Sequence, residues 1–198
     1  MIRHYYQPLA HITVKATDII TVSNPSQPLQ IAADSPAFEA MTDLRRTPTI
    51  SISPDETLDR AKSTMISGSV KLLFVCNGFG ELLGLLTAND LAGERAIVKA
   101  KATHQKVTEL EVGEVMTRLP DLEFLELTEV ATAEVGHIIA TLKAYNRQHA
   151  LVVDHRQTPT QVVGLFSSTQ IARQMGIDVL DPVKASTFAE IEAAVAAT

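Results

Sequence analysis

The sequence of 198 residues contains no tryptophan and one cysteine, and aromatic residues make up 5% of the chain. Stacking platforms for single-stranded nucleic acid need several aromatic side chains, so this composition argues against them. With Cys76 as the sole thiol, no disulfide can form within one chain, as is usual in a reducing compartment. Cys76 ends the apolar run Leu72–Cys76, where a buried thiol is the simplest expectation.

Runs of basic residues are also missing. The chain has 17 Lys and Arg against 23 Asp and Glu, which gives a formal net charge of −6. Proteins that bind nucleic acid usually carry clustered positive charge, so we expect no nucleic-acid partner. A local anion site remains compatible with this balance, because helix N-termini and one or two basic side chains can hold a phosphate.

No apolar run approaches the roughly 18 residues of a membrane span, and the first residues, Met1–Tyr6, contain no apolar signal segment. We therefore expect a cytoplasmic protein without membrane contact. The six histidines show neither an i, i+4 pair nor a cysteine partner, so we expect no metal site. There is no nucleophile elbow, Walker loop or recognisable Ser/His/Asp set, and we expect no catalytic residues and no enzyme.

What the chain does contain is an internal repeat. Leu82–Leu91 is typical of a short apolar strand that turns at Thr87 directly into a helix. Val162–Ile171 has the same order: two aliphatic residues, a glycine, two apolar residues, a hydroxyl residue and, three positions later, a polar residue. Other matches support a duplication, namely Met41 with Met116, Val75 with Val152 and Gly84 with Gly164.

Each repeat predicts a strand, a helix, two strands and a second helix. Ser53–Glu56 has the residues of a capping box, which predicts a helix that begins with Ser53 as its N-cap. The predicted division has an N-terminal extension, two repeats and a helical tail, at residues 1–34, 35–105, 106–176 and 177–198.

With both repeats laid out, the sequence resembles a tandem pair of CBS domains, the Bateman module, over roughly residues 40–176. The resemblance rests on Met41-Thr42 and Met116-Thr117, on the Ser-Pro-Asp-Glu-Thr-Leu stretch at 53–58, and on Leu83–Leu91, which is close to the family's signature. It implies an α+β (α/β-like) fold of two βαββα lobes, packed sheet to sheet about a pseudo-twofold axis. It also implies that two modules form a disc-like homodimer.

The resemblance further implies an adenine-nucleotide cleft, in which Asp90 binds the ribose hydroxyls and Thr87 binds phosphate. Backbone N–H groups and the helix dipole at such a turn favour an anion. Other residues would line the adenine or reach the phosphates, namely Thr47, Thr49, Ile50, Lys71, Arg147 and His149. The candidate ligands are AMP, ADP, ATP and S-adenosylmethionine, and none of them is an obligatory cofactor.

In the second repeat Ser167 and Gln170 stand where the first has Thr87 and Asp90. A neutral amide cannot present two equivalent acceptor oxygens to a ribose, so we expect this second cleft to be weaker. Both pairs also have the spacing of a capping box and could serve only to begin a helix. Two hypotheses follow. The chain is a regulatory module that binds an adenine nucleotide or adenosyl ligand and signals through dimer or partner contacts, or it is a ligand-free dimerisation and interaction scaffold. The sequence does not identify the regulated protein.

Overall fold

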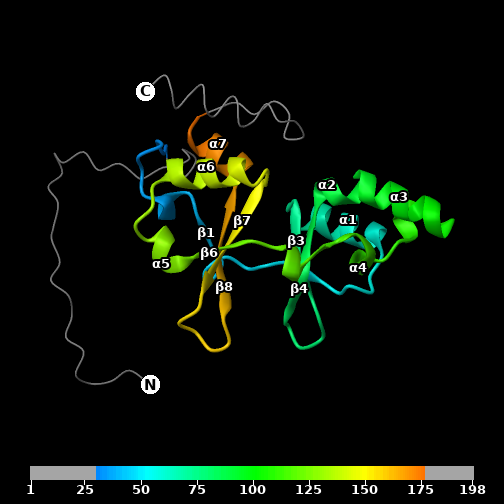
Figure 1. Cartoon of the computed structure of the whole chain (residues 1–198). Helices are drawn as coiled ribbons and strands as arrows, with labels where there is room; N and C mark the ends of the chain where they lie inside the picture. Colours follow the sequence, from blue (N-terminus) through cyan, green and yellow to red (C-terminus); the bar gives the residue numbers. More distant parts are fainter. Residues whose placement is uncertain (1–29, 177–198) are drawn as a thin grey trace, which may run out of the picture.

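The computed structural model describes residues 30–176, which form two mixed sheets of four strands each. Figure 1 shows the sheets in two lobes side by side, joined by extended segments that cross from one to the other. The fold is α+β, as the sequence predicts. The expected N-terminal extension and C-terminal helix lie outside the described residues. Within the described part, no helix combines the length and apolar character needed to cross a bilayer.

The first lobe contains the sheet with strand order β2-β3-β4-β5, in which β2 and β3 are parallel and the other neighbours antiparallel. Its core lies between the sheet and the helices, where Leu73, Val75 and Leu86 are buried. Its elements are β2 (Ser51–Ile52), α1 (Leu58–Ser67), β3 (Leu72–Cys76), β4 (Leu82–Thr87), α2 (Ala88–Leu91), α3 (Glu94–Thr103), η2 (Val107–Glu109), α4 (Val112–Val115) and β5 (Thr117–Arg118).

The second lobe contains the sheet with strand order β1-β8-β7-β6. Phe166, Ile138 and Ile171 are buried between this sheet and its helices. Its elements are η1 (Ala37–Glu39), β1 (Thr42–Asp43), β6 (Phe124–Glu126), α5 (Leu127–Val130), α6 (Val135–Ala144), β7 (His149–Asp154), β8 (Gln161–Ser167) and α7 (Ser168–Gln174), and η3 (Leu119–Asp121) connects β5 to β6.

Each sheet takes one edge strand from the opposite sequence repeat. In the second lobe Thr42 of β1 lies opposite Leu165 of β8, and in the first lobe Thr117 of β5 lies opposite Leu85 of β4. The exchange extends to isolated antiparallel bridges, which join Thr57 to Glu111 and Pro36 to Glu134. The predicted boundaries 35–105 and 106–176 therefore describe sequence repeats, whereas each lobe combines segments of both.

The repeated glycine of the signature makes room for the exchanged strand. A Cβ atom at Gly84 would collide with the carbonyl oxygen of Thr117, and one at Gly164 would collide with Sδ of Met41. Close packing of this kind leaves no space for a methyl group. Each Met-Thr opener thus packs against the glycine of the opposite repeat, from which it is far apart in the sequence.

An apolar layer joins the two sheets. Its buried members come from both lobes and are Leu72, Phe74, Leu85 and Leu151. Phe124 and Leu165 of the second lobe pack against them, together with Cys76 of the first. Cys76 is half-buried, and burial raises the pKa of its thiol. The lobes therefore pack sheet to sheet, as expected.

The predicted start of the first helix was wrong by one turn. The N-cap of α1 is Thr57, whose Oγ1 accepts a hydrogen bond from the N–H of Arg60 at 3.2 Å, and Ser53 precedes the helix. The reason is tertiary. The carbonyl oxygens of Pro54 and Glu56 accept hydrogen bonds from Gly113 and Val112, each at 2.8 Å, so this stretch runs alongside α4.

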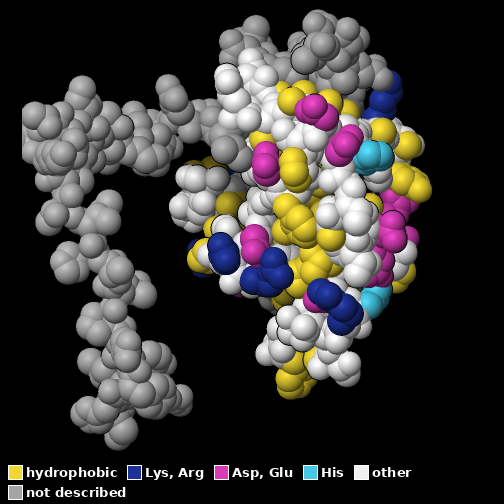
Figure 2. All heavy atoms as spheres, turned by 90° about the vertical axis from the view of Figure 1, so that its left-hand side faces the viewer, with side chains coloured by type: hydrophobic (Ala, Val, Ile, Leu, Met, Phe, Trp, Pro, Cys, Tyr) yellow, Lys and Arg dark blue, Asp and Glu magenta, His cyan; other side chains and the backbone are white. Residues whose placement is uncertain are grey.

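The outer face of the second lobe mixes charges of both signs (Figure 2). Arg45 Nε lies 2.8 Å from Asp43 Oδ1, and Arg156 Nε lies 2.8 Å from Asp154 Oδ1. Hydrogen bonds from these guanidinium groups lower the pKa of both carboxyls. Paired charges of this kind do not create the positive field of a nucleic-acid surface.

Candidate functional site

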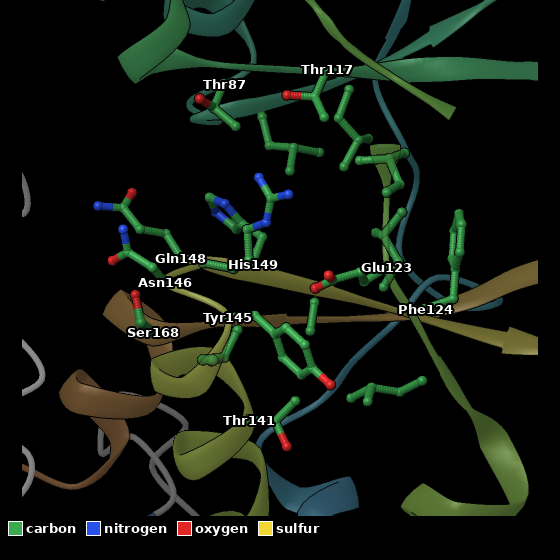
Figure 3. Close-up of a pocket in the computed structure, with 18 of the residues that line it drawn as sticks. Thr87, Thr117, Glu123, Phe124, Thr141, Tyr145, Asn146, Gln148, His149 and Ser168 are labelled. Atoms are coloured by element: carbon green, nitrogen blue, oxygen red, sulfur yellow. The ribbon is translucent and has the colours of Figure 1, made fainter. Parts of the chain in front are cut away.

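A cavity of about 820 Å³ lies between the lobes, beside the turn from β4 to α2. Figure 3 shows Thr87 and Thr117 of the first lobe facing Glu123, Tyr145 and His149 of the second. Apolar residues of both sheets complete the wall, namely Leu72, Leu85, Phe124 and Leu151. Polar side chains make up most of the rest of the lining, and a concave site that combines apolar surface with polar groups suits a small molecule.

The turn beside the cavity is held by Asp90. Its Oδ2 accepts hydrogen bonds from the N–H of Thr87 at 2.8 Å and from Thr87 Oγ1 at 2.7 Å. Asp90 thus stabilises the start of α2, as one of the two sequence hypotheses expected. Its second oxygen, Oδ1, accepts no hydrogen bond from the described residues, so the carboxylate retains acceptor capacity beside the cavity.

His149 begins β7 and lies opposite Ser167 of β8. Burial lowers the pKa of His149 to about 4, although the negative charge of Asp90 acts in the opposite direction. The imidazole is therefore neutral at pH 7 and supplies no cation for a phosphate. Asp90 and His149 come from different lobes and line the same cavity.

Arg147 also lines the cavity and is exposed. Its Nη2 donates a hydrogen bond to the carbonyl oxygen of Asp121 at 3.4 Å. Close by, Asn89 Nδ2 of the first lobe donates to Gln148 Oε1 of the second at 3.1 Å. This hydrogen bond joins the lobes at the cavity, so an entering ligand would lie next to it.

Four predicted residues do not line the cavity. Thr47 and Thr49 are exposed in the segment that leads to β2. Ile50 packs against the core of the first lobe. Lys71 lines a separate groove between α1 and α2. The cavity beside Asp90 faces the opposite repeat, and Leu122–Leu125 of that repeat supply the wall.

Sequence reasoning also missed Glu123, Phe124 and Tyr145. Glu123 directly precedes β6 and Phe124 begins it, whereas residues 47–50 directly precede β2, the matching strand of the first repeat. Applying the same argument to both repeats would have found them. Tyr145 follows α6 and is 58% exposed although it lines the cavity, and no pattern in the sequence distinguishes it from a surface tyrosine.

The second predicted cleft differs from the first. Gln170 Oε1 accepts a hydrogen bond from Thr42 Oγ1 at 3.0 Å. Ser167 is the N-cap of α7, but its side chain makes no capping hydrogen bond. Neither residue lines the inter-lobe cavity, whereas the neighbouring Ser168 does. Across residues 30–176, no three His, Cys, Asp or Glu side chains gather in a way that could hold a metal ion.

Comparisons with known proteins agree with this architecture. Residues 39–96 match the family model of the CBS domain, and the matched part includes Thr87 and Asp90. A search of curated proteins finds no match.

Solved structures resemble the whole described fold. An uncharacterized conserved protein from Pyrococcus horikoshii has a TM-score of 0.54 and 17% identity, with 76% of this chain and 99% of that chain covered. A CBS-domain containing protein from Agrobacterium tumefaciens has a TM-score of 0.51 and 15% identity, covering 78% and 98%. A protein with CBS domains from Burkholderia ambifaria has a TM-score of 0.51 and 16% identity, covering 71% and 96%.

The fold is that of a CBS-domain pair, and the inter-lobe cavity lies where its two sheets meet. Within the chain, residues 39–96 match the CBS domain by sequence. The family resemblance drawn from the repeated signature is thereby confirmed.

Proposed function

We propose that this protein is a non-catalytic regulatory module of the cytoplasm. It binds an adenine nucleotide or adenosyl compound in the inter-lobe cavity and signals through dimer or partner contacts. The observation that carries the proposal is Asp90, whose Oδ1 accepts no hydrogen bond from the described residues and which lines a cavity of about 820 Å³. A carboxylate in this position can accept a hydrogen bond from a ribose hydroxyl.

The two lobes offer complementary parts of such a site. Oδ2 of Asp90 stays in the capping hydrogen bonds with Thr87, and Oδ1 accepts from the ribose. Phe124 and Tyr145 supply aromatic surface against which a purine can stack. Arg147 is available at the cavity for a single phosphate or a carboxylate.

Regulation follows from the position of the cavity between the lobes. A ligand held by Asp90 on one side and Tyr145 on the other favours one lobe arrangement by its difference in affinity for the alternatives. Exposed apolar side chains on α1 and α3 are suitable dimer contacts, namely Ile66, Ile97 and Val98. Sedimentation velocity with and without ligand measures whether the ligand changes the fraction of dimer.

The second candidate is a ligand-free scaffold for dimerisation and protein contacts. The hydrogen bonds from Thr87 to Asp90 favour it, because they give the carboxylate a structural role without any ligand. Under this hypothesis, replacing Asp90 changes the free energy of unfolding and nothing else.

Isothermal titration calorimetry with adenosine, AMP, ADP, ATP and S-adenosylmethionine separates the two candidates. We expect at least one compound to bind, and Asp90→Ala to weaken that binding about tenfold, which corresponds to about 1.4 kcal/mol. Asp59→Ala is the matched control, since it also removes a carboxylate from the first turn of a helix, but outside the inter-lobe cavity. Folded protein that binds none of the five at millimolar concentration would support the scaffold instead. Equal binding by the Asp90 variant and the natural protein would contradict the role proposed for Asp90.

A further inference from the structure

The charged side chains of the inter-lobe cavity are mostly negative. Asp90 and Glu123 contribute two carboxylates, and Arg147 is the one Lys or Arg among the described residues that line it. His149 does not restore the balance at neutral pH, because burial holds its pKa at about 4. A polyphosphate entering here would meet more negative than positive charge.

Glu123 lines the cavity and its side chain is exposed. It stands between Leu122 and Phe124, which both pack in the apolar layer between the sheets, so the backbone around it is anchored. Figure 3 shows its carboxylate pointing into the cavity, between His149 and Tyr145. No described residue forms an ion pair with it.

The matching position of the first repeat carries no charge. Phe124 pairs with Leu151 in the parallel ladder of the second lobe, as Ser51 pairs with Phe74 in the first. Glu123 therefore corresponds to Ile50, which packs against the core of the first lobe. The carboxylate is thus a feature of this wall and not of the repeated fold.

We propose that Glu123 selects ligands by charge, so that the inter-lobe cavity accepts adenosyl compounds with no more than one phosphate and rejects diphosphates and triphosphates. This inference rests on the proposed function of the cavity. Like charges in a partly enclosed site repel more strongly than in open water, because the surrounding protein lowers the local dielectric constant. Arg147 can compensate one phosphate group, whereas the second and third phosphates meet no further Lys or Arg among the described lining residues.

The test is calorimetry with adenosine, AMP, ADP and ATP at one ionic strength, for the natural protein, Glu123→Gln and Glu129→Gln. In the natural protein the dissociation constant of ATP should be at least about tenfold that of adenosine. Glu123→Gln should reduce this ratio of dissociation constants about fivefold. Glu129→Gln removes an equal charge from an exposed site of the same lobe, outside the cavity, and should leave the ratio unchanged. Raising the salt concentration should lower the ratio of the ATP and adenosine dissociation constants in the natural protein, because salt screens the repulsion.

Two results would overturn the proposal that Glu123 selects ligands by charge and would leave the proposed function intact. One is binding of ATP to the natural protein at least as tight as that of adenosine, and the other is the same ratio in Glu123→Gln as in the natural protein. If none of the compounds binds any of the three folded proteins, the proposed function fails and this inference fails with it. Because Glu123 is exposed, its replacement by glutamine should not prevent folding.

Discussion

Thr42 donates a hydrogen bond from Oγ1 to Oε1 of Gln170 at 3.0 Å, so a residue of the first repeat binds the polar residue that replaces the acid in the second. The first lobe is arranged differently, since Thr117 lines the cavity and Asp90 bonds to Thr87. Two matching turns of one duplicated fold thus have different hydrogen bonds. The turn that carries Asp90 lies at the inter-lobe cavity, and Gln170 is bound to a neighbouring strand.

Thr42→Val tests this hydrogen bond. The substitution keeps the shape of the side chain but removes the donor to Gln170, so we expect the free energy of unfolding to fall by about 1 kcal/mol. Thr117→Val changes the matching residue of the other edge strand, which makes no side-chain hydrogen bond with a described residue, and should have a smaller effect. Urea denaturation measures both. Equal losses of unfolding free energy in the two variants would show that the hydrogen bond from Thr42 to Gln170 does not stabilise the fold.

Gly84→Ala tests the close approach of the exchanged strand. Its new methyl group meets the backbone carbonyl of Thr117, which cannot move aside without disturbing β5, so we expect a loss of about 1–3 kcal/mol or more. Gly164→Ala should be less damaging, because the flexible side chain of Met41 can move. Gly78→Ala, with no atom within 4 Å of the new Cβ, should stay within about 0.5 kcal/mol of the natural protein. Chemical denaturation would contradict this account if the three variants were equally stable.

His149 predicts a pH dependence of stability. Its pKa in the folded protein is about 4, below the value of 6.5 expected when unfolded, so the unfolded chain binds more protons between these values. Stability from this residue is complete above pH 6.5 and is lost as the pH falls towards 4, by up to about 3 kcal/mol.

His149→Gln should flatten the dependence of the unfolding free energy on pH between 4 and 6.5. Denaturation curves at half-unit steps of pH measure the slopes. An unchanged slope in His149→Gln would assign the pH dependence to other groups.

Asp90→Ala separates capping from ligand binding when it is measured without ligand. It removes the acceptor for the N–H and Oγ1 of Thr87 and should lower the free energy of unfolding by about 1 kcal/mol. Asp90→Asn retains an acceptor oxygen and should lose less. A loss that is equal in both variants would mean that the charge beside the helix N-terminus, and not the hydrogen bonds, stabilises α2.

Much of the fold could be predicted from local patterns. Apolar runs indicated strands, and the repeated glycine and hydroxyl residues indicated two matching turns from strand to helix. The pairing of Thr87 with Asp90 is also local, since the residues are three positions apart and their hydrogen bonds need no distant partner. The helix start at Thr57 escaped prediction, because contacts with the distant α4 determine it.

For the candidate site, too, local sequence predicts some residues and tertiary packing decides the others. The sequence alone determined that Asp90 stands at a turn from strand to helix and that its counterpart, Gln170, has no carboxylate. Only the tertiary structure decided that Glu123 and Tyr145 line the same cavity as Asp90 and that residues 47–50 do not. The physical reason is that spacing along the chain specifies turns and caps, whereas the exchange of β1 and β5 and the packing of the two sheets bring distant residues to one cavity.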